Sequence, residues 1–126
     1  MSNPNKIKGD WAERVIKAAL RGLGFPWTEK TRAGYERDLG DLHLVPGQLV
    51  IAQVKNVRTP RWLEWMADLE TQKANADADV AFLVWKPGGL GEARADEWLA
   101  VMPVREMAVL LRRAGYGHPL DEEEVA

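Results

Sequence analysis

The chain has 126 residues, of which 46% are hydrophobic and 29% are charged, and it contains no cysteine. This length predicts a single domain, and the lack of cysteine excludes thiolate metal sites, cysteine nucleophiles and disulfides. No apolar run reaches the ~18 residues that a membrane span requires. We therefore expect a cytoplasmic protein with no membrane partner, one domain over residues 6–117, and an acidic flexible tail over residues 118–126.

The charges are unevenly distributed along the chain. Residues 1–61 contain 11 Lys/Arg and 6 Asp/Glu, whereas residues 62–126 contain 6 Lys/Arg and 13 Asp/Glu. A basic half can present a positive face to a polyanion even though the whole chain carries a formal charge of −2. Charge alone therefore permits a nucleic-acid partner and does not identify one.

The first predicted element is an amphipathic helix over residues 9–23, with Gly24 as its C-cap. Apolar residues fill one broad arc of this helix, and Arg14, Lys17 and Arg21 fill the opposite arc. Glu13 falls at the border of the apolar arc. Its carboxylate is either half-buried along the edge of the core or simply the first acid of a solvated face, where it would also suit the helix dipole.

A short strand is predicted over residues 25–32, followed by a polar loop over residues 33–38. A hairpin then joins a strand over residues 40–45 to a strand over residues 49–55 through a turn at Pro46-Gly47. Because the second strand is almost continuously apolar, we expect it to be covered on both faces.

The second half predicts a helix that is capped by Thr59, begins at Pro60 and ends near Ala76. Buried strands follow over residues 80–85 and 98–102. The last helix starts at Pro103 and ends at Gly115, and its inner face should carry Val104, Met107, Ala108 and Leu111. Four tryptophans on the apolar faces, Trp62, Trp65, Trp85 and Trp98, are predicted to lie in the core or in a dimer interface. The fold class is therefore α/β, a small mixed sheet flanked by helices in the order α-β-β-β-α-β-β-α.

The hairpin brings together three polar groups. Gln53 and Lys55 are two residues apart on a strand and so share a face. A two-residue turn would pair Asp41 with Ala52 and turn it away from them. A three-residue connection over 46–48, or a bulge near Gly40, would place Asp41 opposite Gln53, and the interpretation below requires this second geometry.

A carboxylate, an amide oxygen and a lysine in one patch suit phosphodiester chemistry. Oxygen ligands favour a hard cation such as Mg²⁺, which can polarise a phosphate and lower the pKa of a bound water. A lysine can stabilise the charge that develops on the phosphate. In the alternative interpretation, Asp41 only caps a turn and Lys55 only extends to solvent from the sheet.

The chain resembles the PD-(D/E)xK nuclease superfamily and, within it, the archaeal- and phage-type Holliday-junction resolvases. The segment KGDWAERVIKAALRGLGF is similar to that family's opening helix, Gly40-Asp41 stands at the strand acid, and Gln53-Val54-Lys55 stands at the Glu-x-Lys position. The resemblance implies a restriction-endonuclease-like core over about residues 6–86. It also implies that Glu13, Asp41 and Gln53 hold Mg²⁺, with Mn²⁺ as a substitute, and that Lys55 is the catalytic lysine.

The resemblance further implies a homodimer that makes two symmetric nicks in branched DNA. Residues expected to bind phosphates are Lys8, Arg14, Lys30, Arg32, Arg58 and Arg61; Arg32 begins a segment that is similar to a mobile family loop.

The chain departs from the family pattern at Gln53, which replaces the second acid, and at Gly40, which replaces a proline. Gln-x-Lys also occurs in Mrr-like restriction endonucleases, which cut linear duplex. Three alternatives therefore stay open: a junction-resolving endonuclease, a duplex restriction or repair endonuclease, and a nuclease-fold module that binds DNA or dimerises without catalysis.

Overall fold

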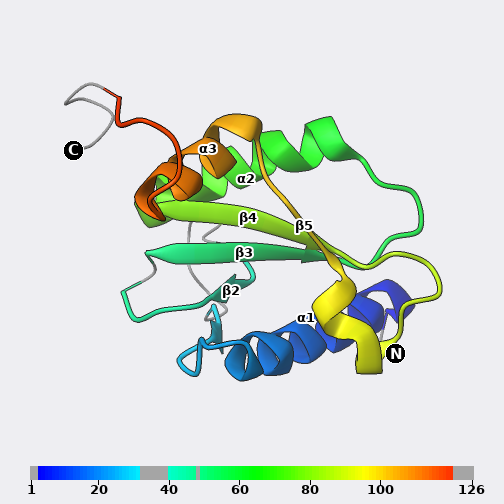
Figure 1. The fold of residues 1–126 in the computed structure, drawn as a ribbon. Helices are drawn as coiled ribbons and strands as arrows, with labels where there is room; N and C mark the ends of the chain where they lie inside the picture. The colour runs from blue at the N-terminus through cyan, green and yellow to red at the C-terminus, as the bar shows by residue number, and fades with distance from the viewer. Residues whose placement is uncertain (1–2, 32–39, 48, 121–126) are drawn as a thin grey trace.

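A computed structural model of the chain describes residues 3–31, 40–47 and 49–120. The elements run in the order α1 (Pro4–Gly22), β1 (Glu29–Lys30), β2 (Leu42–His43), β3 (Val50–Lys55), α2 (Trp62–Ala76), β4 (Val80–Trp85), η1 (Glu92–Glu97), β5 (Leu99–Val101) and α3 (Val104–Arg113) (Figure 1). This confirms the predicted mixed α/β fold. The one addition is η1, a 3₁₀ helix before β5.

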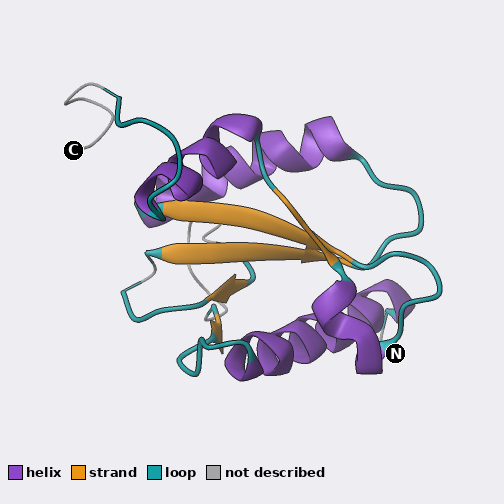
Figure 2. Cartoon of the chain, viewed as in Figure 1, coloured by secondary structure: helices purple, strands orange, loops and turns teal. Residues whose placement is uncertain are grey.

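The five strands form one sheet in the order β1-β2-β3-β4-β5. β3 and β4 are parallel, and every other neighbouring pair is antiparallel. Figure 2 shows α1 and η1 on one side of this sheet and α2 and α3 on the other. No helix in the described part of the chain is long and apolar enough to cross a membrane.

The core lies on both faces of β3 and β4. On one face Ala12, Val15 and Ile16 of α1 pack with Ala52 and Val54 of β3. On the other face, Trp65 and Leu69 of α2 pack with Ile51 of β3 and with Ala81 and Leu83 of β4. Alternate residues of β3 therefore pack into the cores on opposite faces of the sheet, which explains the almost unbroken apolar sequence of the strand. This confirms that the strand is covered on both faces.

The ends of the helices differ from the predictions. α1 begins at Pro4, because the side chain of Asn3 accepts a hydrogen bond from the Asn5 backbone N–H at 2.9 Å and caps the helix. It ends at Gly22 with Leu23 as C-cap, so Gly24, at φ +114°, is one residue beyond the cap. α2 begins at Trp62 with Arg61 as its N-cap and no side-chain cap, so the prediction of a Thr59 cap was wrong.

The strands are also shorter than predicted. The described part of the segment 25–32 contains only the two-residue strand β1, and β2 is reduced to Leu42–His43. β4 has the predicted bounds, Val80–Trp85. The predicted loop over residues 33–38 and the acidic residues 121–126 lie outside the described part of the chain.

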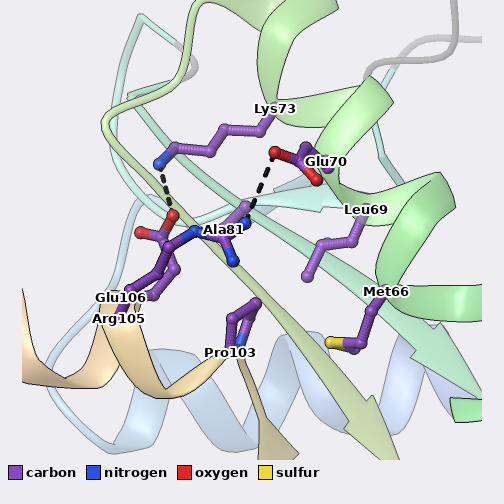
Figure 3. Close-up of a pocket in the computed structure, with 8 residues that line it drawn as sticks. All are labelled: Met66, Leu69, Glu70, Lys73, Ala81, Pro103, Arg105 and Glu106. Atoms are coloured by element: carbon purple, nitrogen blue, oxygen red, sulfur yellow. Dashed lines mark hydrogen bonds and ion pairs between the residues drawn. The ribbon is translucent and has the colours of Figure 1, made fainter. Parts of the chain in front are cut away.

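The prediction for the last helix was wrong about its inner face. No residue of α3 is buried, and Val104, Met107 and Leu111 are exposed, Val104 to 77%. The face turned toward the protein combines half-buried Ala108, Val109 and Leu110 with ion-paired side chains. Glu106 accepts a hydrogen bond from Lys73 at 2.9 Å and Arg105 donates one to Glu70 at 3.3 Å, both across a small cavity of about 90 Å³ between α2 and α3 (Figure 3).

A third ion pair fixes the end of α3: Arg113 binds Asp79 at 2.6 Å. Val104, Met107 and Leu111 thus face outward, and α3 is attached both by ion pairs to α2 and Asp79 and by its half-buried Ala108, Val109 and Leu110. The tryptophans predicted to be in the core or in an interface differ in exposure. Trp65 and Trp98 are buried as expected, whereas Trp62 is exposed.

Candidate active site

The hairpin of β2 and β3 has the three-residue connection that was one of the two alternatives. Leu42 pairs with Ala52 and His43 with Ile51, and the Leu44 N–H donates to the Val50 carbonyl at 2.9 Å. This is the pairing of a three-residue connection over 46–48. The regular pairing does not extend to Asp41, whose N–H donates to the Ala52 carbonyl at 3.0 Å, so that Asp41 and Leu42 both lie opposite Ala52, as in a β-bulge. The chain enters β2 through Gly40, whose φ of +88° favours glycine.

Asp41 lies where β2 stops pairing with β3. Its backbone N–H donates to the Ala52 carbonyl at 3.0 Å, and its carboxylate Oδ2 accepts a hydrogen bond from the Val54 N–H at 2.8 Å. The carboxylate thus replaces a strand as partner of the β3 backbone. This bond gives Asp41 a local structural role and also holds its charge at the edge of β3, between the residues that carry Gln53 and Lys55.

Glu13 approaches Asp41 from α1. Its side chain is 13% exposed, and Lys30 Nζ lies 3.8 Å from its Oε2. Burial raises the pKa of Glu13 to about 7; the negative charge of Asp41 and then that of Asp10 also raise it, while Lys30 opposes the shift. The charge of Asp41 therefore acts on Glu13, and the low exposure of the Glu13 side chain favours its half-buried alternative.

The cleft beside Glu13 holds more charge than the sequence suggested. It has a volume of about 280 Å³ and is lined by Asp10, Glu13, Arg14, Lys17, Lys30 and Leu42. Lys30 Nζ lies 3.5 Å from Asp10 Oδ1, so this lysine bridges two acids of α1. Sequence reasoning missed Asp10, although its place one turn before Glu13 on the same helix was a usable signal.

Gln53 and Lys55 project from the other face of the sheet. Ala52 and Val54 belong to the core under α1, so the alternation of β3 directs Gln53 and Lys55 toward α2. Lys55 Nζ lies 5.6 Å from the centre of the Trp65 ring, a cation–π contact. The predicted residues thus approach the edge of β3 from two sides: Glu13 from α1, Gln53 and Lys55 from the α2 face, with Asp41 between them.

The donor set suits a hard cation. Two carboxylates and one amide oxygen are ligands that Mg²⁺ accepts. The Oε1 atom of Gln53 is buried and has no hydrogen-bond partner among the described residues, which is costly unless another group binds it. Within residues 3–31, 40–47 and 49–120, no group of three or more His, Asp or Glu residues could hold a metal. Because Glu13 approaches from the α1 face and Gln53 from the α2 face, the two could share a metal only at the edge of β3, where Asp41 lies.

Several predicted phosphate-binding residues surround this edge. The Lys8 carbonyl accepts a hydrogen bond from Asn56, the residue after Lys55, at 3.3 Å, so the start of α1 lies against the end of β3 (Figure 1). Arg58 lies in the loop that leaves β3, and Arg61 at the end of that loop pairs with Glu64 at 3.5 Å. Arg32 is outside the described residues.

Sequence reasoning also missed Lys86. Its backbone N–H donates to the Lys55 carbonyl at 3.1 Å. It therefore adds a cation at the same ends of β3 and β4, and its place directly after a buried strand was the available signal.

No known protein family, no curated protein and no solved structure matches this chain.

Proposed function

We propose that this chain is a Mg²⁺-dependent endodeoxyribonuclease with a restriction-endonuclease-like core of the PD-(D/E)xK type, acting on four-way DNA junctions as a homodimer. The observation that carries the proposal is the position of Asp41. Its carboxylate is bound to the backbone of the strand that carries Gln53 and Lys55, and it is close enough to Glu13 to raise the pKa of that group.

The roles of the residues follow from their chemistry. Asp41, Glu13 and Gln53 would hold the metal, which when bound polarises a phosphate and supplies an activated water. The Val54 N–H fixes the orientation of the Asp41 carboxylate. Lys55 carries a positive charge that can stabilise the charge developing on a phosphate, if its side chain leaves the Trp65 ring for the DNA.

Cations at the carboxyl ends of β3 and β4 support DNA as the substrate. Lys55 and Lys86 stand at these ends, Arg58 and Arg61 follow in the loop after β3, and Lys8 lies against Asn56. Such cations bind phosphates of any sequence and raise the affinity for a polyanion.

A second candidate is a DNA-binding module without catalysis. Two observations favour it: an amide replaces the second acid at residue 53, and the ammonium of Lys55 is bound to Trp65. Metal affinity separates the two candidates, because a module without catalysis has no use for a metal site.

The test uses an Asp41→Asn variant, which can keep the hydrogen bond to the Val54 N–H while it removes the charge. We expect the wild type to nick a synthetic four-way junction with Mg²⁺ or Mn²⁺, and Asp41→Asn and Lys55→Ala to lose this activity. Asp96→Ala, which removes an exposed acid of η1, serves as the matched control and should cut normally.

Calorimetry with Mn²⁺ should show heat for the wild type that disappears in Asp41→Asn. A linear duplex of the same sequence, added as competitor, separates a junction-selective enzyme from a duplex restriction or repair enzyme. Absence of cleavage on every branched and linear DNA, together with absence of Mn²⁺ heat, would leave only the module without catalysis. Sedimentation analysis tests the homodimer.

A further inference from the structure

The segment between β3 and α2 exposes three large apolar side chains within seven residues. Val57 is 46% exposed, Trp62 is 37% exposed, and Leu63 is 90% exposed. Single exposed apolar residues are ordinary, but a cluster at one protruding turn commonly marks a binding surface. We call residues 57–63 the β3–α2 tip.

The tip is anchored at both ends by the same residue. Trp85 Nε1 donates a hydrogen bond to the Val57 carbonyl at 2.8 Å, and the Trp85 ring contacts the Trp62 ring at 5.4 Å between centroids, at 78°. Trp62 also meets Trp65 at 5.4 Å and 88°. Two edge-to-face contacts and a hydrogen bond therefore hold the tip in place, so little conformational entropy is lost when it binds a partner.

The tip continues the basic edge described above. Trp85 pairs with Lys55 across β3 and β4, and the Lys55 ammonium lies over Trp65, the residue that supports Trp62. Arg58 and Arg61 lie within the tip itself. The exposed apolar side chains are therefore flanked by Arg58 and by Arg61, which also pairs with the exposed Glu64, and they lie beside the lysine proposed to act on the phosphate.

This combination fits nucleic acid better than another protein surface. Cations next to apolar side chains match a duplex, in which phosphates flank stacked bases and an inserted leucine or aromatic ring can replace a neighbouring base. We propose that the β3–α2 tip is a DNA wedge: Leu63 and Trp62 contact unstacked bases, while Arg58 and Arg61 bind the flanking phosphates.

The wedge rests on the proposed nuclease function and specifies its substrate. Inserting a side chain between bases costs unstacking energy, and this cost is lowest where bases are already unstacked or easily kinked. The tip would therefore select DNA with a discontinuity, such as a branch point, over continuous duplex of the same sequence.

The test is carried out in EDTA, so that binding is measured without cleavage. A four-way junction carries 2-aminopurine beside the branch point, and the fluorescence of this base rises when it is unstacked. We expect wild-type protein to raise the fluorescence. The Leu63→Ala variant should not raise it and should bind the junction about 10-fold more weakly, while its affinity for duplex is unchanged.

The control is Val104→Ala, which truncates another largely exposed aliphatic residue, on α3 and far from the tip in sequence, and should behave as wild type. Arg58→Gln should weaken binding to junction and duplex alike and reduce the salt dependence by about one phosphate contact. Because Leu63 is almost fully exposed, its variant should keep the wild-type unfolding midpoint.

Several results would overturn the wedge. If Leu63→Ala binds the junction as Val104→Ala does, with the same fluorescence, the tip does not insert. If Leu63→Ala instead turns a dimer into a monomer while each protomer keeps its DNA affinity, the tip is a contact between two copies. Failure of the wild type to bind any DNA would refute both proposals. Protein that unstacks the junction in EDTA but never cuts it with Mg²⁺ or Mn²⁺ would refute only the nuclease.

Discussion

Replacing Glu13 by glutamine should stabilise the protein at neutral and higher pH. The folded state holds the pKa of Glu13 at about 7 against an ordinary value of 4.5, so between these pH values the folded state keeps a proton that the unfolded state has released. Stability therefore falls as pH rises from about 4.5 to about 7 and is level above that. Glutamine resembles the protonated acid and does not incur this loss.

The size of the effect follows from the proton affinity. A tenfold change in proton affinity is worth about 1.4 kcal/mol, so the raised pKa corresponds to about 3 kcal/mol at most. Because the side chain borders the open cleft with Lys30, we expect solvent and that ammonium to reduce the gain to between about 1 and 3 kcal/mol.

The assay is urea unfolding of wild type and Glu13→Gln at pH 4 and pH 8, in EDTA so that no cation compensates the charge. The two proteins should have similar stability at pH 4, and the variant should be more stable at pH 8. The control is Glu97→Gln: the pKa of the exposed Glu97 is lowered by its hydrogen bond from Arg94, so this change should bring no gain at pH 8. Parallel pH profiles for wild type and Glu13→Gln would refute the reasoning, since they would mean that Glu13 is not held near Asp41 in a poorly solvated position.

Three further predictions concern the same site and the attachment of α3. Asp41→Asn removes the repulsion and should lower the pKa of Glu13, which an NMR titration of the Glu13 carboxyl carbon would show. An unchanged pKa would mean that the charges of the two groups do not interact. Gln53→Glu adds a third carboxylate and should tighten Mn²⁺ binding several-fold by calorimetry, while weaker or equal binding would exclude residue 53 as a ligand. Lys73→Met leaves Glu106 without its partner and should lower the free energy of unfolding in urea by about 1–2 kcal/mol. Lys73→Arg should be closer to wild type. Equal unfolding midpoints for wild type and Lys73→Met would show that the pair does not contribute to stability.

Much of the fold could be predicted because its elements are marked by local patterns. β4 is an apolar run that stops at Lys86-Pro87, and the prediction matched its bounds. The start of α1 could not be found from apolar spacing, because its first turn is polar and its cap is Asn3. Periodicity also could not orient α3. The ion-pair partners that help to fix its orientation come from α2 and from Asp79, far away in sequence, and leave Val104, Met107 and Leu111 exposed.

For the candidate site, the hairpin could be predicted up to its register. The register depends on whether the turn includes residue 48, and the sequence is compatible with both possibilities. The pairing of Leu42 with Ala52 shows the longer turn, whereas the bond from the Asp41 N–H to the Ala52 carbonyl interrupts the pairing before it reaches Gln53. The position of Lys55 against Trp65 and of Lys30 between Asp10 and Glu13 depends on how helices pack on the sheet. No spacing within a single element carries that information.

The ionic attachment of α3 has a consequence for how the molecule opens. A helix whose attachment includes exposed ion pairs loses part of its restraint as added salt screens them, whereas the sheet beneath it depends on apolar contacts that salt does not weaken. Amide hydrogens of α3 should therefore exchange with deuterated solvent faster in molar salt, while those of β3 keep their protection. The terminal helix is then a separately opening unit, and the ionic strength of the medium sets how often it detaches.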